Sequence, residues 1–148
     1  MGLDQAIRKV SPEMAEKLMA WQTSDTQEDD AYPLAGEAYD REMTEVWTGR
    51  KENHIQSAIA EITGQEIQNC DYLFLTKKQV QTLLGRLEQV AADHSKAAEI
   101  LPTQAGFFFG GTGYDEWYFR DIEQELEDFT KILNEWDDSA RYAYWAWW

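Results

Sequence analysis

The segment that most constrains the fold spans residues 104–118, with the sequence QAGFFFGGTGYDEWY. Its three consecutive phenylalanines demand burial, whereas three of the next four residues are glycines, which permit backbone conformations that other residues avoid. An acidic and aromatic cluster follows, and then a long stretch in which apolar residues recur at helical spacing. We therefore expect the phenylalanines to enter the core, the glycines to turn the chain, and a helix to begin just beyond them.

This long helix is predicted to have two different faces. Thr112 is suited to cap it, and Asp115 and Glu116 fall in the first turn, where the helix dipole favours negative charge. Its apolar face is predicted to consist of Tyr118, Ile122, Leu126, Phe129, Leu133 and Trp136. The opposite face is predicted to be anionic, with Asp115, Glu116, Asp121, Glu123, Glu125, Glu127, Asp128, Glu135, Asp137 and Asp138 against Arg120 and Lys131.

Local signals predict a strand and a helix near the N-terminus. Residues 3–10 alternate as a strand does, with Leu3, Gln5, Ile7 and Lys9 on one side and Asp4, Ala6, Arg8 and Val10 on the other. Ser11 followed by Pro12 then marks the start of a helix.

Residues 23–36 are polar and acidic without periodicity, so we expect a loop there. A divalent cation has suitable oxygen ligands in that loop, but their spacing is not that of a calcium loop, and no metal is predicted.

The central part of the chain alternates between helical and extended patterns. Residues 37–47 fit a strand or a helix equally well. A helix is predicted from beyond Gly49 to Thr63, followed by Gly64 in the position after its end, and a strand is predicted over residues 70–75. Thr76 and Gln79 form a capping box for the next helix, whose apolar stripe is Val80, Leu84, Leu87 and Ala91, flanked by Leu83 and Val90.

His54 adjoins the apolar face of the helix that ends at Thr63. The other histidine, His94, falls in a different helix, and no Cys–His spacing frames either one. We therefore interpret His54 as a half-buried or surface residue, not as a ligand.

The C-terminal segment, RYAYWAWW over residues 141–148, has high strand propensity. Exposed aromatic patches of this size are rare, so the segment must be buried in its own fold, in a partner, or in a homo-oligomer. Pairing with the N-terminal strand is the simplest solution. The predicted fold is thus α+β, one domain over residues 1–148, with three to four helices packed on a small antiparallel sheet that includes the N- and C-terminal strands.

Three motifs together resemble a family of small phage and prophage proteins. They are MGLD at residues 1–4, LPTQAGFFFG at residues 101–110, and YDEWY at residues 114–118. Members of that family commonly end in an aromatic strand, as this chain does. Some members carry the label phosphoglycerate kinase, which the motifs of this chain do not support. The resemblance implies a phage context and little chemistry.

The glycines at positions 110, 111 and 113 precede a helix, which is the arrangement of an anion site. A P-loop requires Gly-Lys-Ser/Thr at its end, whereas Tyr114, Asp115 and Glu116 follow here, and these carboxylates repel phosphate. No nucleophile elbow and no Cys–His frame is present. We therefore interpret Gly110, Gly111 and Gly113 as a backbone turn, and we predict a protein that is not an enzyme and has no cofactor.

The net charge of −15 is the feature that most restricts the partners. Such an acidic surface repels phosphate backbones and anionic membranes, so direct nucleic-acid and membrane binding are not expected. We expect a protein that inhibits or redirects a host protein with a basic surface, and one form of such a protein is a nucleic-acid mimic of the anti-defence type. The alternative is a protein that sequesters a small ligand or nucleotide with residues 106–118. The predicted partner-binding residues are Tyr114, Asp115, Glu116, Trp117, Tyr118, Asp121, Glu125 and Asp128.

Cys70 is the one cysteine of the chain, so an internal disulfide is excluded, which fits a reducing compartment. No apolar run reaches the roughly 20 residues needed to span a bilayer, and the N-terminus lacks the basic and apolar regions of a secretory signal. We therefore expect a soluble protein of the host cytoplasm.

Overall fold

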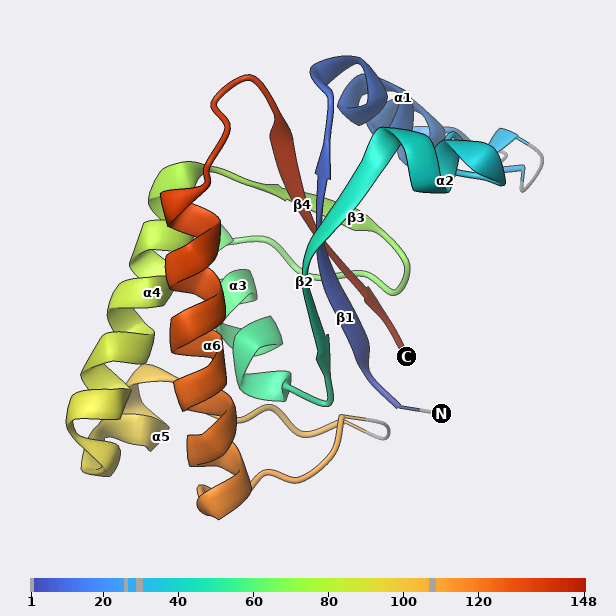
Figure 1. The fold of residues 1–148 in the computed structure, drawn as a ribbon. Coiled ribbons are helices and arrows are strands. Elements are labelled where there is room, and N and C mark those ends of the chain that lie inside the picture. Colours follow the sequence, from blue (N-terminus) through green and yellow to red (C-terminus); the bar gives the residue numbers. More distant parts are fainter. Residues whose placement is uncertain (1, 26, 29–30, 107–108) are drawn as a thin grey trace.

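Four antiparallel strands form the centre of the fold, in the order β2-β1-β4-β3 (Figure 1). The structure, a computed structural model, describes residues 2–25, 27–28, 31–106 and 109–148. The elements are β1 (Asp4–Val10), α1 (Pro12–Thr23), α2 (Glu37–Glu42), β2 (Met43–Arg50), α3 (Asn53–Thr63), β3 (Tyr72–Leu75), α4 (Lys77–Ala92), the 3-10 turn η2 (His94–Lys96), α5 (Ala97–Ile100), α6 (Glu116–Asn134) and β4 (Arg141–Trp147). The predicted α+β class is confirmed.

Both ends of the chain contribute strands to the sheet, as predicted. β1 lies between β2 and β4 and pairs with both in antiparallel register, so that Ile7 faces Trp47 on one side and Tyr144 on the other. The pairing with β2 shifts by one residue between Ile7 and Arg8. β3 then pairs with the outer edge of β4. The aromatic C-terminal segment is therefore largely buried within its own fold, although Trp147 remains 51% exposed.

The two faces of the sheet are covered by different helices. α3, α4 and α6 pack on one face, whereas α1 and α2 lie toward the other (Figure 1). Side chains in and just before β1 divide accordingly: Leu3 and Ile7 enter the larger core under α3, α4 and α6, and Val10 enters the smaller core with α1. The alternation predicted for residues 3–10 is confirmed.

Local capping signals fix several helix ends. The side chain of Ser11 accepts a hydrogen bond from the backbone of Met14 at the start of α1. Thr76 and Gln79 form the predicted capping box of α4. Gly64 follows α3 in the left-handed conformation, at φ +67°, which glycine adopts without steric cost.

The structure corrects two predictions about local structure and decides a third point that the sequence left open. Residues 37–47, which fitted either element, divide into α2 and the start of β2. The strand predicted over residues 70–75 begins at Tyr72. In α4 the fully buried stripe includes Leu83 and Val90, while Leu84 and Ala91 are only partly buried. The helix therefore presents a slightly rotated face to α3 and α6.

The start of α6 also differs from the prediction. Asp115, not Thr112, is the N-cap, because its carboxylate accepts a hydrogen bond from the backbone of Tyr118 at 3.1 Å. Five residues separate the end of the Phe run from this cap, so the glycine segment forms a loop of its own before the helix. Phe109 is buried as expected, whereas Phe107 and Phe108 lie outside the described residues.

No helix in the described part of the chain combines the length and apolarity needed to cross a bilayer.

Candidate functional site

A cleft of about 290 Å³ opens between the start of α3, the glycine loop and the first turns of α6. Many of the predicted turn and partner-binding residues line it: Gly110, Gly111, Gly113, Asp115, Trp117, Tyr118 and Asp121. His54 and Lys51 complete the wall from the side of α3. The cleft thus brings the glycine loop next to a histidine that is distant in the sequence.

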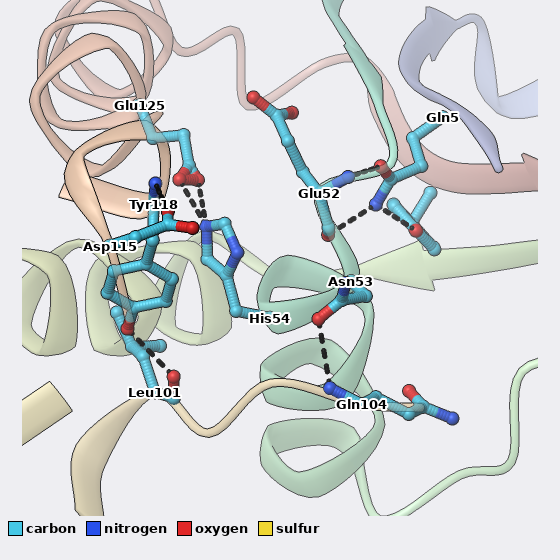
Figure 2. Close-up of polar contacts among 10 residues, drawn as sticks. Gln5, Glu52, Asn53, His54, Leu101, Gln104, Asp115, Tyr118 and Glu125 are labelled. Atoms are coloured by element: carbon cyan, nitrogen blue, oxygen red, sulfur yellow. Dashed lines mark hydrogen bonds and ion pairs between the residues drawn. The ribbon is translucent and has the colours of Figure 1, made fainter. Parts of the chain in front are cut away.

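Asn53 holds the glycine loop in place. Its side-chain amide donates to the carbonyl oxygens of Phe109 at 3.0 Å and Gly111 at 2.9 Å. Its Oδ1 accepts from the backbone N–H of Gln104 at 2.9 Å (Figure 2). Because Asn53 is itself buried at the first turn of α3, it fixes both sides of the loop to a rigid helix.

Gly110 of the glycine loop packs against Lys51, and both residues have a positive φ. Gly110 has φ +87°, and a side chain there would meet that of Lys51. Lys51 itself has a positive φ of 58°, which is uncommon for a residue other than glycine. The positive φ and the close approach of the Lys51 side chain therefore favour a glycine at position 110.

A buried His–Glu pair forms the floor of the cleft. Nε2 of His54 lies 2.5 and 2.7 Å from the two carboxyl oxygens of Glu125 (Figure 2). The side chains are 3% and 0% exposed, respectively. The interpretation of His54 as a half-buried or surface residue is therefore wrong, and so is the placement of Glu125 on the outer anionic face of α6.

Burial determines the protonation of this pair. It raises the pKa of Glu125 well above its usual range, assisted by the nearby carboxylates of Asp121 and Asp128. It lowers the pKa of His54 to about 4, against the opposing effect of Asp121. Both shifts favour the uncharged forms of the two groups, because burial disfavours charge.

Glu52 adds a second buried acid beside this pair. Burial raises its pKa to about 9, and the nearby carboxyl groups of Glu125, Asp121 and Asp128 act in the same direction. Its Oε2 is a buried atom without a hydrogen-bond partner among the described residues. The backbone of Glu52 is fixed on both sides by the side chain of Gln5, at 2.8 and 2.9 Å (Figure 2).

Asp121 is a half-buried carboxylate on the wall of the cleft. Burial raises its pKa, and Asp115 adds to this effect while His54 opposes it. No hydrogen bond or ion pair of the described residues involves its side chain. Its oxygens are therefore available to a molecule in the cleft.

The predicted residues differ in how exposed they are at the edge of the cleft. Trp117 is 69% exposed and Tyr114 is 38% exposed. Glu116 and Asp115 are exposed beside them, whereas Asp128 is half-buried. Tyr118 is buried instead, with its hydroxyl donating to the carbonyl of Leu101 at 2.8 Å. The predicted partner-binding residues therefore include exposed side chains, such as Trp117 and Glu116, and a buried one, Tyr118, which stabilises the fold.

Sequence reasoning missed Glu52, Asn53 and the role of His54. His54 is separated from Glu125 by 71 positions, and no local spacing connects them. One signal was available on α6, because Glu125 lies three residues after Ile122 and four before Phe129, which places it on the buried face.

The described residues contain no group of three or more His, Cys, Asp or Glu side chains arranged to hold a metal ion. Comparison of the chain with models of protein families, with curated proteins and with solved structures finds no match.

Proposed function

We propose that the protein is a non-enzymatic acidic binding protein that inhibits or redirects a host protein with a basic surface. The observation that carries this proposal is the exposure of Trp117 in the first turn of an acidic helix. Trp117 is 69% exposed, with the 38% exposed Tyr114 nearby in the sequence, and tryptophan is among the residues that most often dominate a binding interface.

The charges around Trp117 favour a basic partner. Glu116, Glu123 and Glu127 are exposed on α6, and only Glu116 among them has an ion pair, with Arg120 at 3.2 Å. The guanidinium of Arg120 also lies 5.1 Å from the ring of Trp117. An arginine or lysine of a partner could occupy the same ring face while the surrounding carboxylates neutralise its neighbours.

The net charge of −15 also favours a basic partner at distances beyond direct contact. Long-range attraction accelerates encounter with a basic surface and is screened by salt. Proteins that bind nucleic acids carry such surfaces, and the resemblance to small phage proteins supports a bacterial defence factor as the target. Binding by mimicry of a phosphate backbone would block the target's own substrate.

Affinity capture from bacterial lysate tests the proposal with a matched pair of tryptophan variants. Trp117→Ala removes the proposed anchor, whereas Trp147→Ala removes a tryptophan that is 51% exposed at the end of β4. We expect the wild type and Trp147→Ala to retain the same basic protein at low salt. Trp117→Ala should weaken this binding at least about tenfold, because an anchor residue contributes about 2 kcal/mol or more. Equal capture by all three proteins, or no stoichiometric partner, contradicts the proposal.

A further inference from the structure

The two edges of the β-sheet are finished differently. β3, with four residues, forms one edge. The backbone N–H of Tyr72 in this strand donates to Oε1 of Gln22 at 2.5 Å, and its carbonyl accepts from Nε2 of Gln22 at 2.9 Å, so the amide of Gln22 takes the place of a neighbouring strand. β2, with eight residues, forms the other edge, and no further strand of the described residues pairs with it. A long edge strand of this kind offers a row of backbone groups to another chain.

The register of the sheet shows which backbone groups of β2 point outward. The backbone N–H of Lys51 donates to the carbonyl of Leu3 at 2.7 Å, so these residues form a hydrogen-bonded pair. Hydrogen-bonded and non-hydrogen-bonded pairs alternate along antiparallel strands. Arg50 and Thr48, which lie one and three positions before Lys51, therefore form pairs of the second kind with β1. Their N–H and C=O groups point away from β1, toward the open edge.

A row of three cavities follows this edge along α6, and we call it the β2–α6 groove. The cavities have volumes of about 290, 250 and 290 Å³. Each is lined by a part of β2 and a part of α6: residues 44–46 with Lys131 and Ile132, residues 45–48 with Asp128, and Arg50 with Trp117, Tyr118 and Asp121. The strand and the helix lie side by side (Figure 1), and the rings of Trp47 and Phe129 join them at a centroid distance of 5.4 Å.

The charges in the middle of the groove favour a basic occupant. The middle cavity, where Thr48 lies, is lined by the carboxylates of Glu45 and Asp128 and by no basic side chain of the described residues. Glu45 forms an ion pair with Arg8 at 3.4 Å, whereas Asp128 accepts a hydrogen bond from the neutral amide of Gln124 at 3.0 Å, which leaves its charge uncompensated. A second copy of this chain is a poor occupant, because each copy carries a net charge of −15 and like charges would meet at the shared edge.

We propose that the outer edge of β2 binds an extended basic segment of the partner, which adds to the sheet as a further strand. The backbone of the segment pairs with the outward groups of Thr48 and Arg50, and one of its lysine or arginine side chains enters the cavity beside Glu45 and Asp128. In recognition of this type, main-chain hydrogen bonds provide affinity and side-chain cavities provide specificity. This mode of binding rests on the proposed function and narrows the basic partner to one with an extended segment, since Trp117 lines the end of the same groove.

Fluorescence anisotropy with three labelled peptides tests the strand pairing without the natural partner. The probe is a short peptide in which valine and lysine alternate. One control replaces each lysine with glutamate, and the other methylates every backbone nitrogen of the probe, which keeps its charge and removes its N–H donors. We expect the probe to bind and both controls to bind at least about tenfold more weakly, because strand addition uses main-chain hydrogen bonds and the groove favours positive charge. No binding of the probe, equal binding of its methylated form, or a preference for the glutamate peptide overturns the proposal.

Two variants at one position locate the binding at β2. Thr48→Pro removes an outward N–H at an exposed position of an edge strand, where proline is tolerated, and Thr48→Ala removes the side chain but keeps the N–H. We expect Thr48→Pro to weaken binding of the valine–lysine peptide at least about tenfold and Thr48→Ala to bind like wild type. Equal binding by wild type and by Thr48→Pro that is folded by circular dichroism overturns the assignment. If Thr48→Pro does not fold, the methylated peptide decides the question on the wild type.

Failure of this mode of binding and failure of the proposed function give different results. If a basic partner whose capture depends on Trp117 binds folded Thr48→Pro as tightly as wild type, strand addition at β2 is wrong and the proposed function stands. If no basic partner is captured while the valine–lysine peptide binds wild type and not Thr48→Pro, the proposed function is wrong and the binding site at β2 stands.

Discussion

The buried carboxyl group of Glu52 makes a specific prediction about stability in alkaline solution. Raising the pH from about 7 to about 9 should lower the free energy of unfolding, and Glu52→Gln should remove the part of that loss that Glu52 causes. The folded protein holds a proton on Glu52 because burial raises its pKa to about 9 from the usual 4.5. The unfolded chain has already released this proton at pH 7, so stability decreases as the pH rises toward the folded-state pKa.

The magnitude follows from the width of this window. One proton bound by the folded state and not by the unfolded chain changes stability by about 1.4 kcal/mol per pH unit. Between about pH 7 and 9 the loss from Glu52 is therefore about 2 kcal/mol. Glu125 acts in the same direction, because its pKa is also raised. His54 acts in the opposite direction, but only in the acidic range between its folded-state pKa of about 4 and its usual 6.5.

Urea unfolding followed by tryptophan fluorescence at the two pH values measures this effect. A Cys70→Ser background is preferable, because the pKa of Cys70 is also raised by burial. Glu123→Gln is the control, since it removes an exposed carboxylate from α6. Wild type and control should lose stability in parallel, and Glu52→Gln should lose distinctly less. An equal loss in Glu52→Gln and wild type would refute the assignment of a buried, protonated acid at this position.

Three further substitutions test the packing around the site and the sheet. Glu125→Ala should cost about 1–3 kcal/mol, because it leaves the buried ring of His54 without its hydrogen-bonding partner, and Glu123→Ala on the same helix should cost under about 0.5 kcal/mol in the same urea titration. Asn53→Ala should cost about 2–3 kcal/mol and accelerate amide hydrogen exchange in the glycine loop that Asn53 holds. Trp145→Ala should cost about 2–4 kcal/mol in thermal unfolding, because Trp145 packs on the sheet and lies 4.3 Å from the guanidinium of Arg8.

Each of these predictions has a contradicting result. Similar costs for the alanine substitutions at Glu125 and Glu123 would mean that the His–Glu pair is not buried. Unchanged exchange in the loop of Asn53→Ala would mean that other contacts hold it. A fully stable Trp145→Ala would mean that β4 is not anchored by this side chain.

The sequence was sufficient for features that depend on neighbouring residues. Ser11 and the Thr76–Gln79 pair cap their helices because capping involves groups only three residues apart. The terminal strands were predicted from alternation and from aromatic content. These local patterns defined the α+β class before any tertiary contact was known.

The sequence was misleading where a polar residue lies on a buried helix face. Leu126 and Glu125 are adjacent, and the sequence analysis assigned the apolar Leu126 to the buried face of α6 and Glu125 to the exposed face. In the structure Glu125 is fully buried and Leu126 only partly so, because His54 of α3 supplies a hydrogen-bonding partner. That partner is brought close by the packing of α3 and α6 on one face of the sheet, which no spacing in the sequence encodes.

The sequence likewise predicted only part of the candidate site. Residues 110–121 were identified by their glycines, aromatic rings and carboxylates, and most of them line the cleft. Asn53 and Glu52 gave no signal, since a single amide and a single acid at a helix start are common on protein surfaces. Their importance comes from burial, which depends on the whole fold.

The most direct test of the central claim measures binding of the captured partner to wild type, to Trp117→Ala and to a Glu123→Lys/Glu127→Lys variant at several salt concentrations. The account predicts that charge reversal lowers the association rate and flattens its dependence on salt, because steering acts on encounter. It predicts that Trp117→Ala mainly accelerates dissociation. Association that is independent of both salt and the charge of α6 would contradict the claim that this helix presents an acidic binding surface.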